Sequence, residues 1–303
     1  MRILIAFDGS TSAEQSLGLA DSIDWPVDST LRVATVVEPA LYVGGPLAGG
    51  MDVPQPNAED TIAYQQEVVT TAADKVRSAE RTVEGVVLRG RPASALVEEA
   101  RQFRADLLMA GSRGRGSISS LLLGSVSAEL VDDAPCPVLV SRTPSINHVI
   151  FATDGSVYSM AAEDVLSTWQ IFERMPIDVV SVADVVKPWH TGVAPTMYRQ
   201  VLEAHAKDLS EARSEHARIA GEATARLTTR GRQAHAAPRT GDAAAEIIAA
   251  ATELGGDLVV MGSRGQTGLS RVLLGSVARN VIQGSTTSVL VVHAPRSSND
   301  PTS

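Results

Sequence analysis

The stretch RILIAFDGS, at Arg2–Ser10, decides the fold because an uninterrupted apolar run leads directly into Asp-Gly-Ser. An apolar run of this length predicts a strand that is buried on both faces, as strands of parallel sheets are. The same pattern returns as HVIFATDGS at His148–Ser156, 146 residues later. The chain is therefore expected to contain at least two equivalent buried strands, each ending on an aspartate.

Two further stretches also occur twice, in the same order. DLLMAGSRG at Asp106–Gly114 returns as DLVVMGSRG at Asp257–Gly265, and LLLGSVSAELV at Leu121–Val131 returns as VLLGSVARNVI at Val272–Ile282. Both of these spacings are 151 residues. Three blocks in one order with closely matched spacing indicate an internal duplication.

The length of 303 residues agrees with two domains, at roughly 100–200 residues for each. The polar, proline-containing stretch SRTPSIN at Ser141–Asn147 is typical of a linker. We therefore expect one domain at 1–143 and a second at 147–295. The polar residues 296–303 are expected to form a flexible tail.

Each copy alternates apolar strands with amphipathic helices. The first copy predicts strands at Ile3–Phe7, Leu31–Val37, Val83–Leu88, Asp106–Ala110 and Pro137–Ser141, with helices at about Ser12–Ile23, Glu59–Thr82, Pro92–Phe103 and Ser125–Asp132. The second predicts strands at Val149–Thr153, Ile177–Ala183, Gln233–Ala236, Asp257–Met261 and Ser288–His293, with helices at Val157–Phe172, Met197–Arg230, Ala243–Leu254 and Ser276–Gln283. The expected fold class is α/β, as two tandem Rossmann-like open parallel sheets with helices on both faces.

Composition excludes several classes of function. The net charge of −9 disfavours a broad electrostatic hold on nucleic acid, and no apolar run reaches the length of a membrane span. The N-terminus lacks the pattern of a secretory signal, so a cytoplasmic protein is expected. The single cysteine, Cys136, is expected to be a small buried residue rather than a nucleophile. No lysine stands in a Gly-Lys-Ser/Thr context, so a Walker A loop is absent.

The strongest candidate site is a glycine pattern that follows the fourth strand of each copy. Gly111–Gly114 is followed after nine residues by Gly124–Ser125, and Gly262–Gly265 is followed after nine by Gly275–Ser276. Glycines permit close approach of the backbone, and main-chain amides at such a loop and at a helix start suit phosphate oxygens. Ser125, Ser276, Arg113 and Arg264 could add a hydroxyl and a positive charge in each copy. The alternative interpretation is an ordinary turn followed by a helix-start glycine.

An aspartate ends the first strand of each copy, at Asp8 and Asp154. Ligands of open parallel sheets bind beyond the carboxyl ends of the strands, so these carboxylates could accept bonds from a ribose or orient a metal-bound water. Asp-Gly-Ser also suits an Asx turn and helix cap without any ligand.

The glycine spacing together with the strand-end aspartates resembles the universal stress protein family, in its ATP-binding tandem-domain form. The resemblance covers Met1 to about Pro295 and includes RGRPASALVEEA at Arg89–Ala100 with its counterpart TGDAAAEIIAA at Thr240–Ala250. It implies that adenine nucleotide is held in the first copy by Ala6, Asp8, Val36, Gly111, Ser112, Arg113, Gly114, Gly124, Ser125 and Val126. It implies the same role in the second copy for Ala152, Asp154, Val182, Gly262, Ser263, Arg264, Gly265, Gly275, Ser276 and Val277. Val36 and Val182 would otherwise be interpreted as core residues.

The resemblance implies a nucleotide-responsive regulator in stress adaptation or growth control that binds ATP with Mg²⁺. It also implies that the last strands pair the two domains edge to edge, with a homodimer as a further expectation and no membrane or nucleic-acid partner. Cyclic AMP stays open as a competitor for the adenine pocket. A slow ATP hydrolase or an adenylate-forming enzyme is the alternative, although no general base accompanies the glycine loop, and a flavin-binding carrier is a weaker one.

Overall fold

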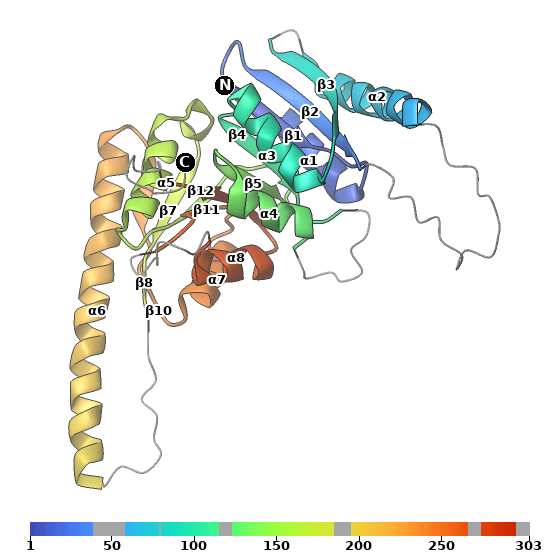
Figure 1. Cartoon of the computed structure of the whole chain (residues 1–303). Helices are drawn as coiled ribbons and strands as arrows, with labels where there is room; N and C mark the ends of the chain where they lie inside the picture. The colour runs from blue at the N-terminus through green and yellow to red at the C-terminus, as the bar shows by residue number, and fades with distance from the viewer. Residues whose placement is uncertain (39–57, 79, 115–122, 185–194, 266–273, 295–303) are drawn as a thin grey trace, which may run out of the picture. The chain divides into compact units, whose positions relative to one another are not determined.

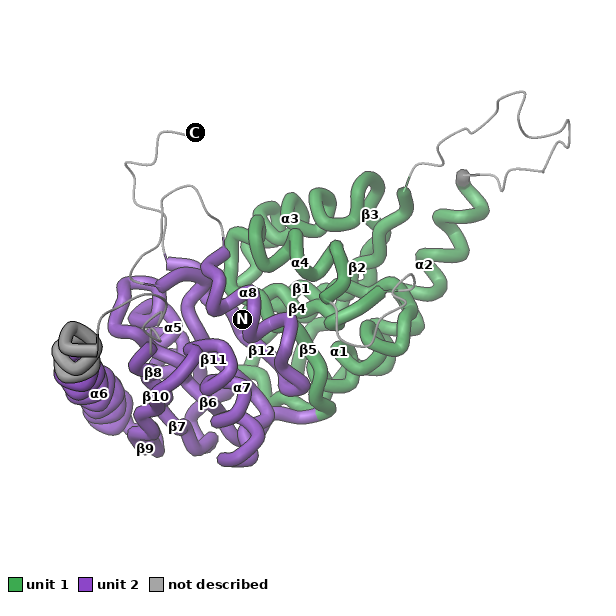
Figure 2. Tube along the Cα trace, turned by 90° about the horizontal axis from the view of Figure 1, so that it is seen from below, with its two compact units in different colours: residues 1–144 green, residues 145–303 purple. Residues whose placement is uncertain are grey.

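The computed structural model describes residues 1–38, 58–78, 80–114, 123–184, 195–265 and 274–294, with the backbone alone for 58 and 195–205 (Figure 1). The chain divides into two compact units, Met1–Pro144 and Ser145–Ser303 (Figure 2). The expected tail at 296–303 lies outside the described residues.

Unit 1 holds five parallel strands in the order β3-β2-β1-β4-β5. The strands are β1 (Arg2–Ala6), β2 (Thr30–Val37), β3 (Thr82–Arg89), β4 (Leu107–Gly111) and β5 (Val138–Ser141). The helices are α1 (Thr11–Ser22), α2 (Ala58–Lys75), α3 (Pro92–Phe103) and α4 (Ser125–Asp133).

Unit 2 repeats this order as β9-β7-β6-β11-β12, again parallel, with a small parallel pair of β8 and β10 beside it. Its strands are β6 (Val149–Ala152), β7 (Pro176–Val180), β8 (Val182–Ala183), β9 (Gln233–Ala236), β10 (Arg239–Thr240), β11 (Leu258–Gly262) and β12 (Ser288–Val292). Its helices are α5 (Val157–Thr168), α6 (Pro195–Thr229), α7 (Ala243–Glu253) and α8 (Ser276–Gly284), with a 3₁₀ turn at Gln170–Phe172.

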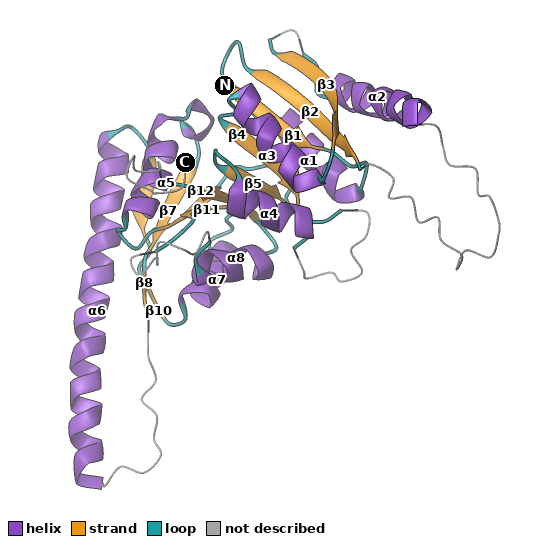
Figure 3. Cartoon of the chain, in the orientation of Figure 1, coloured by secondary structure: helices purple, strands orange, loops and turns teal. Residues whose placement is uncertain are grey.

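The central strands of both units are buried on both faces. Every residue of β4 and of β11 is buried, although successive side chains of a strand point to opposite faces. Helices therefore cover both sides of each sheet, with α3 packed on α4 and α7 packed on α8 (Figure 3). The predicted fold class of two tandem α/β units is confirmed.

Three predicted boundaries are wrong. The helix expected at Glu59–Thr82 ends at Lys75, because the chain turns back through a bridge between Ser78 and Arg81 to begin β3. The helix expected at Val157–Phe172 ends at Thr168, since Trp169 takes an extended conformation before the 3₁₀ turn.

The strand expected at Ile177–Ala183 is divided at Ser181. The Ser181 carbonyl accepts a hydrogen bond from the Arg239 backbone N–H, at 2.9 Å, and the Ser181 hydroxyl bonds Nδ1 of His216 at 2.8 Å. The chain therefore leaves β7 and pairs with β10 instead.

The Asp-Gly-Ser triplets make a tight turn from strand to helix. Gly9 and Gly155 have φ of 72° and 75°, which favours glycine, and the hydroxyls of Ser10 and Ser156 cap the next helix. This turn directs α1 and α5 back over β4 and β11. Among the described helices, none combines the length and apolar content that crossing a bilayer requires.

Candidate functional site

The strand order of each unit reverses between the first and fourth strands of the repeat. In unit 1, β1 lies between β2 and β4, and in unit 2, β6 lies between β7 and β11. The chain beyond these two carboxyl ends carries the strand-end aspartate on one side and the glycine motif on the other. Such reversal points are where open α/β sheets bind ligands.

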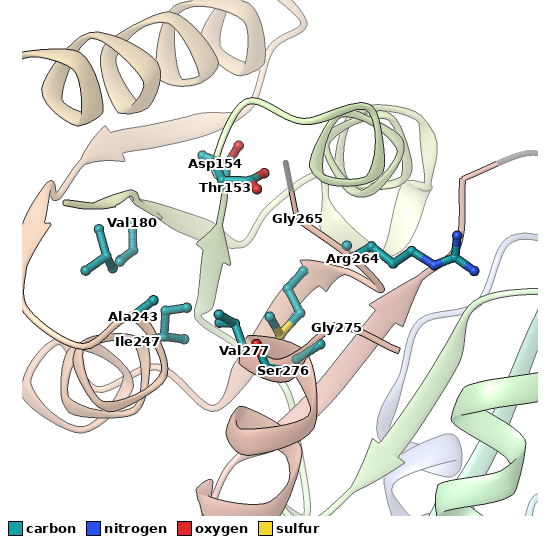
Figure 4. A pocket seen from close by; sticks show the side chains of 14 residues that line it. Thr153, Asp154, Val180, Ala243, Ile247, Arg264, Gly265, Gly275, Ser276 and Val277 are labelled. Atoms are coloured by element: carbon teal, nitrogen blue, oxygen red, sulfur yellow. The ribbon is translucent and has the colours of Figure 1, made fainter. Parts of the chain in front are cut away.

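In unit 2 a cavity of about 360 Å³ opens at this reversal point (Figure 4). Its volume lies in the range of small-molecule sites, roughly 300–1,000 Å³. Eight of the predicted residues line it: Asp154, Val182, Gly262, Arg264, Gly265, Gly275, Ser276 and Val277.

The walls of the cavity are mostly apolar, with a few polar groups among them. Val180, Ala243 and Ile247 form one side, whereas Asp154 and Gly265 lie together at another (Figure 4). A few placed polar groups among apolar walls are typical of a pocket for a flat, amphipathic small molecule.

The first glycine of each motif is required by packing. A Cβ placed on Gly262 would lie 2.6 Å from the carbonyl carbon of Tyr158, and one on Gly111 would lie 2.6 Å from that of Ser12. These atoms are helix backbone, which cannot move aside as a flexible side chain can. Close contact between helix and strand therefore explains both residues without a ligand.

The second glycine of each motif faces the aspartate. A Cβ on Gly265 would lie 2.8 Å from Oδ2 of Asp154, and one on Gly114 would lie 2.9 Å from Oδ2 of Asp8. The other carboxylate oxygen of each aspartate accepts a bond from the backbone N–H of Ser156 or Ser10, at 3.0 and 2.9 Å. Glycine at these two positions leaves space directly beside the carboxylate.

The third glycine closes the loop and begins a helix. The Gly275 N–H donates to the Ser263 carbonyl at 2.8 Å, and the Gly124 N–H donates to that of Ser112 at 2.9 Å. The N-cap residue of α8 and of α4 is a glycine, which has no side chain with which to cap the N-terminal amides. Amides at a helix N-terminus favour anions, and Ser276 begins α8 on the lining of the cavity.

Unit 1 places its predicted residues in equivalent positions of the fold. Ala6 is the last residue of β1, and Val36 of β2 pairs with Leu88 of β3. Ser125 and Val126 are the first two residues of α4. Val36 and Val126 are half-buried, and Ser125 is exposed.

Three predicted residues point into the protein. Ala152 and Ser263 are buried and are absent from the cavity lining of unit 2. In unit 1, Ser112 is buried, and its hydroxyl lies 3.3 Å from that of Ser12 on α1. Their side chains contribute to packing beneath the site, because the side chain of a strand-end residue follows the pleat of its strand.

Two arginines, Arg113 and Arg142, lie close enough together in unit 1 for their charges to interact. Burial and the positive charge of Arg113 lower the pKa of Arg142 to about 10. Among the described residues there is no group of three or more His, Cys, Asp or Glu arranged to hold a metal ion.

Six lining residues of unit 2 were not predicted: Thr153, Val180, Ala243, Ile247, Met261 and Ala278. Ala243 and Ile247 are four residues apart at the start of α7, so they share one helix face. That spacing was visible in the sequence, but only the fold shows that this face turns toward β6 and β8.

The model of the universal stress protein family matches residues 1–142 and again 145–293. A universal stress protein of Thermus aquaticus is 35% identical over 147 residues, which are 46% of this chain and 97% of the relative.

Two solved structures are similar to this chain to different extents. A universal stress protein from Archaeoglobus fulgidus aligns with 97% of this chain and 98% of its own, at 18% identity and a TM-score of 0.66, which shows the fold. A universal stress protein solved in complex with cAMP covers 50% of this chain and 99% of its own, at 26% identity and a TM-score of 0.36.

Proposed function

The chain belongs to the universal stress protein family, and from this premise we propose that it is a nucleotide-responsive regulator, acting in stress adaptation or growth control, whose two units bind ATP. The observation that carries the proposal is the cavity of unit 2, which joins apolar walls to Asp154, to Gly265 beside it and to the start of α8.

Different parts of the cavity suit the base, the ribose and the phosphates of a nucleotide. The apolar side, with Val180 and Ile247, suits an adenine ring, and the carboxylate of Asp154 suits the hydroxyls of a ribose. The amides at the start of α8 suit phosphate oxygens, because a helix N-terminus favours anions. Glycine at position 265 keeps the side of the Asp154 carboxylate clear of a side chain. Main-chain amides would thus replace the lysine of a Walker A loop.

The site also fits a magnesium ion that arrives with the phosphates. Mg²⁺ keeps several waters and uses one or two carboxylates, and Asp154 or Asp8 offers one carboxylate in each unit. The hydroxyl of Ser276 or Ser125 is a second hard oxygen at the start of the following helix. The ion would neutralise phosphate charge, and these oxygens would hold its water shell.

The first experiment identifies the ligand directly. Freshly purified chain is denatured, and mass spectrometry measures any small molecule that is released. Release of ATP at up to two per chain supports the proposal, and release of cAMP would reassign the ligand. Absence of affinity for adenine nucleotides at millimolar concentration with Mg²⁺ would refute it.

A matched pair of variants locates the site. Gly275→Val and Gly124→Val each add a branched side chain beside the loop, where a Cβ meets backbone no closer than 3.4 and 3.3 Å. Each variant is expected to lose about one nucleotide per chain, and Gly221→Ala, with no atom within 4 Å of the new Cβ, is expected to lose none. The same preparations report phosphate release, and several turnovers per second would favour the hydrolase.

Self-association remains a prediction of the sequence. Light scattering of the purified chain, with and without ATP, measures its mass in solution. Twice the mass of one chain supports the homodimer, and a single-chain mass in both conditions excludes it.

A further inference from the structure

The side chain of Arg264 is held by α5. Its Nη1 donates a hydrogen bond to the Tyr158 hydroxyl at 3.1 Å, and its Cζ lies 5.4 Å from the centroid of the Tyr158 ring. A guanidinium within about 6 Å of an aromatic centroid is attracted by the ring. Tyr158 therefore restrains the charged group of Arg264 by two separate contacts.

The held conformation leads away from the cavity. Arg264 lines the cavity next to Gly265, but its guanidinium extends away from Val180, Ala243 and Ile247 (Figure 4). The Arg264 guanidinium, which we expected beside the phosphates, is thus held to one side of the pocket (Figure 4).

Unit 1 lacks this restraint, because Ser12 stands where unit 2 has Tyr158, 146 residues apart. The Ser12 hydroxyl accepts a bond from the Arg113 backbone N–H at 3.2 Å, whereas the Arg113 side chain is exposed. A serine has neither the length nor the aromatic face to hold a guanidinium. The same Gly-Ser-Arg-Gly motif therefore presents its arginine differently in the two units.

We propose that Tyr158 is a positioning residue that withholds the Arg264 guanidinium from the phosphate end of the unit 2 site. It thereby makes this site less sensitive to the number of phosphates on an adenine nucleotide. The inference rests on the proposed function, since it concerns how that site selects among its ligands. To reach a phosphate, Arg264 has to give up the ring and the hydroxyl, so part of the gain from a charge-assisted bond is lost.

The test compares competition by adenosine, AMP, ADP and ATP against photolabelling with 8-azido-ATP, in the full chain. Peptide mapping reports unit 1 and unit 2 separately, so unit 1 is an internal control. In Tyr158→Ser, which loses the ring, the ATP-to-adenosine affinity ratio at unit 2 is expected to rise about two- to fivefold, the scale of one exposed cation–π contact. In Tyr158→Phe, which keeps the ring and loses only the hydrogen bond, a rise of about twofold is expected. Adenosine affinity and all values at unit 1 are expected to stay unchanged.

Two further variants show that the arginine is responsible. Adding Arg264→Gln to Tyr158→Phe is expected to abolish the rise. Tyr64→Phe removes a hydroxyl from the exposed Tyr64 of α2 and is expected to change no ratio. If Tyr158→Ser lowers the melting temperature of the free chain, Tyr158→Phe, which keeps the ring, carries the test.

The outcomes separate the two proposals. If ATP does not reduce photolabelling of either unit, adenine-nucleotide binding itself is refuted. Nucleotide binding with an unchanged ratio in both Tyr158 variants would leave the proposed function standing and overturn this inference. A lower ratio would overturn it too, because it would show that Tyr158 presents Arg264 to the phosphates.

Discussion

A Cβ placed on Gly262 would lie 2.6 Å from the carbonyl carbon of Tyr158, so the end of β11 touches the backbone of α5 directly. This contact sets how closely the helix approaches the sheet. It also places the loop after β11 against the start of α5, where Tyr158 meets Arg264. The first glycine of the motif thus shapes the site through packing.

Replacing this glycine is expected to destabilise unit 2. Gly262→Ala puts a methyl group against the Tyr158 carbonyl and the Ser159 N–H nitrogen, at 2.6–2.8 Å, and overpacking costs about 1–3 kcal/mol. Urea unfolding of the free chain measures the loss. Gly221→Ala in α6 has open space around the new methyl and serves as the control. Equal stability of Gly262→Ala and wild type would contradict the packing explanation.

Gly18 in α1, unlike Gly262, has room for a side chain. Gly18 is exposed in the middle of Thr11–Ser22, and a Cβ there meets nothing within 4 Å. Gly18→Ala is expected to raise the free energy of unfolding by about 0.5–1 kcal/mol, because alanine loses less backbone entropy in a helix. Thermal unfolding of unit 1 provides the measurement, and a decrease in stability would show that α1 needs the glycine for another reason.

The strand-end aspartate allows binding and folding to be separated. Asp154→Asn keeps an oxygen that can accept the bond from the Ser156 N–H, so little change in melting temperature is expected. Loss of the charge is expected to weaken nucleotide binding about tenfold, on the scale of a hydrogen bond to a charged group. Calorimetric titration with ATP tests this, with Asp8→Asn as the equivalent change in unit 1. Unchanged affinity in both variants would remove the aspartates from the proposed site.

The single thiol is expected to be inert in the folded chain. Burial raises the pKa of Cys136 to about 12, and the thiolate is the reactive form. At pH 8 a thiol reagent should therefore modify native protein far more slowly than denatured protein. Since the folded state holds the thiol proton between pH 9 and 12, its contribution to stability falls as pH rises through that window. Rapid modification of native protein would show that the segment leading into β5 opens readily.

The period of the apolar residues predicted most of the fold, because a strand buried on both faces shows no polar alternation. The spacing of Asp8 and Gly111–Gly114, repeated in Asp154 and Gly262–Gly265, indicated which segments meet. It did so because parallel strands bring their carboxyl ends to one edge. Apolar periodicity could not show the end of α2 at Lys75, because a bridge between Ser78 and Arg81 turns the chain there. It could not show the division at Ser181 either, which depends on hydrogen bonds to residues distant in the chain.

The sequence by itself determined the duplication, the parallel sheets and the glycine motif at the reversal point of each sheet, because these follow from local periodicity and repetition. Only the tertiary structure decided what each glycine does and where each arginine points. The reason is that Gly262 and Gly265 differ solely in what lies opposite them, helix backbone or a carboxylate. Likewise, the side chain of Arg264 is directed by Tyr158, 106 residues earlier in the chain.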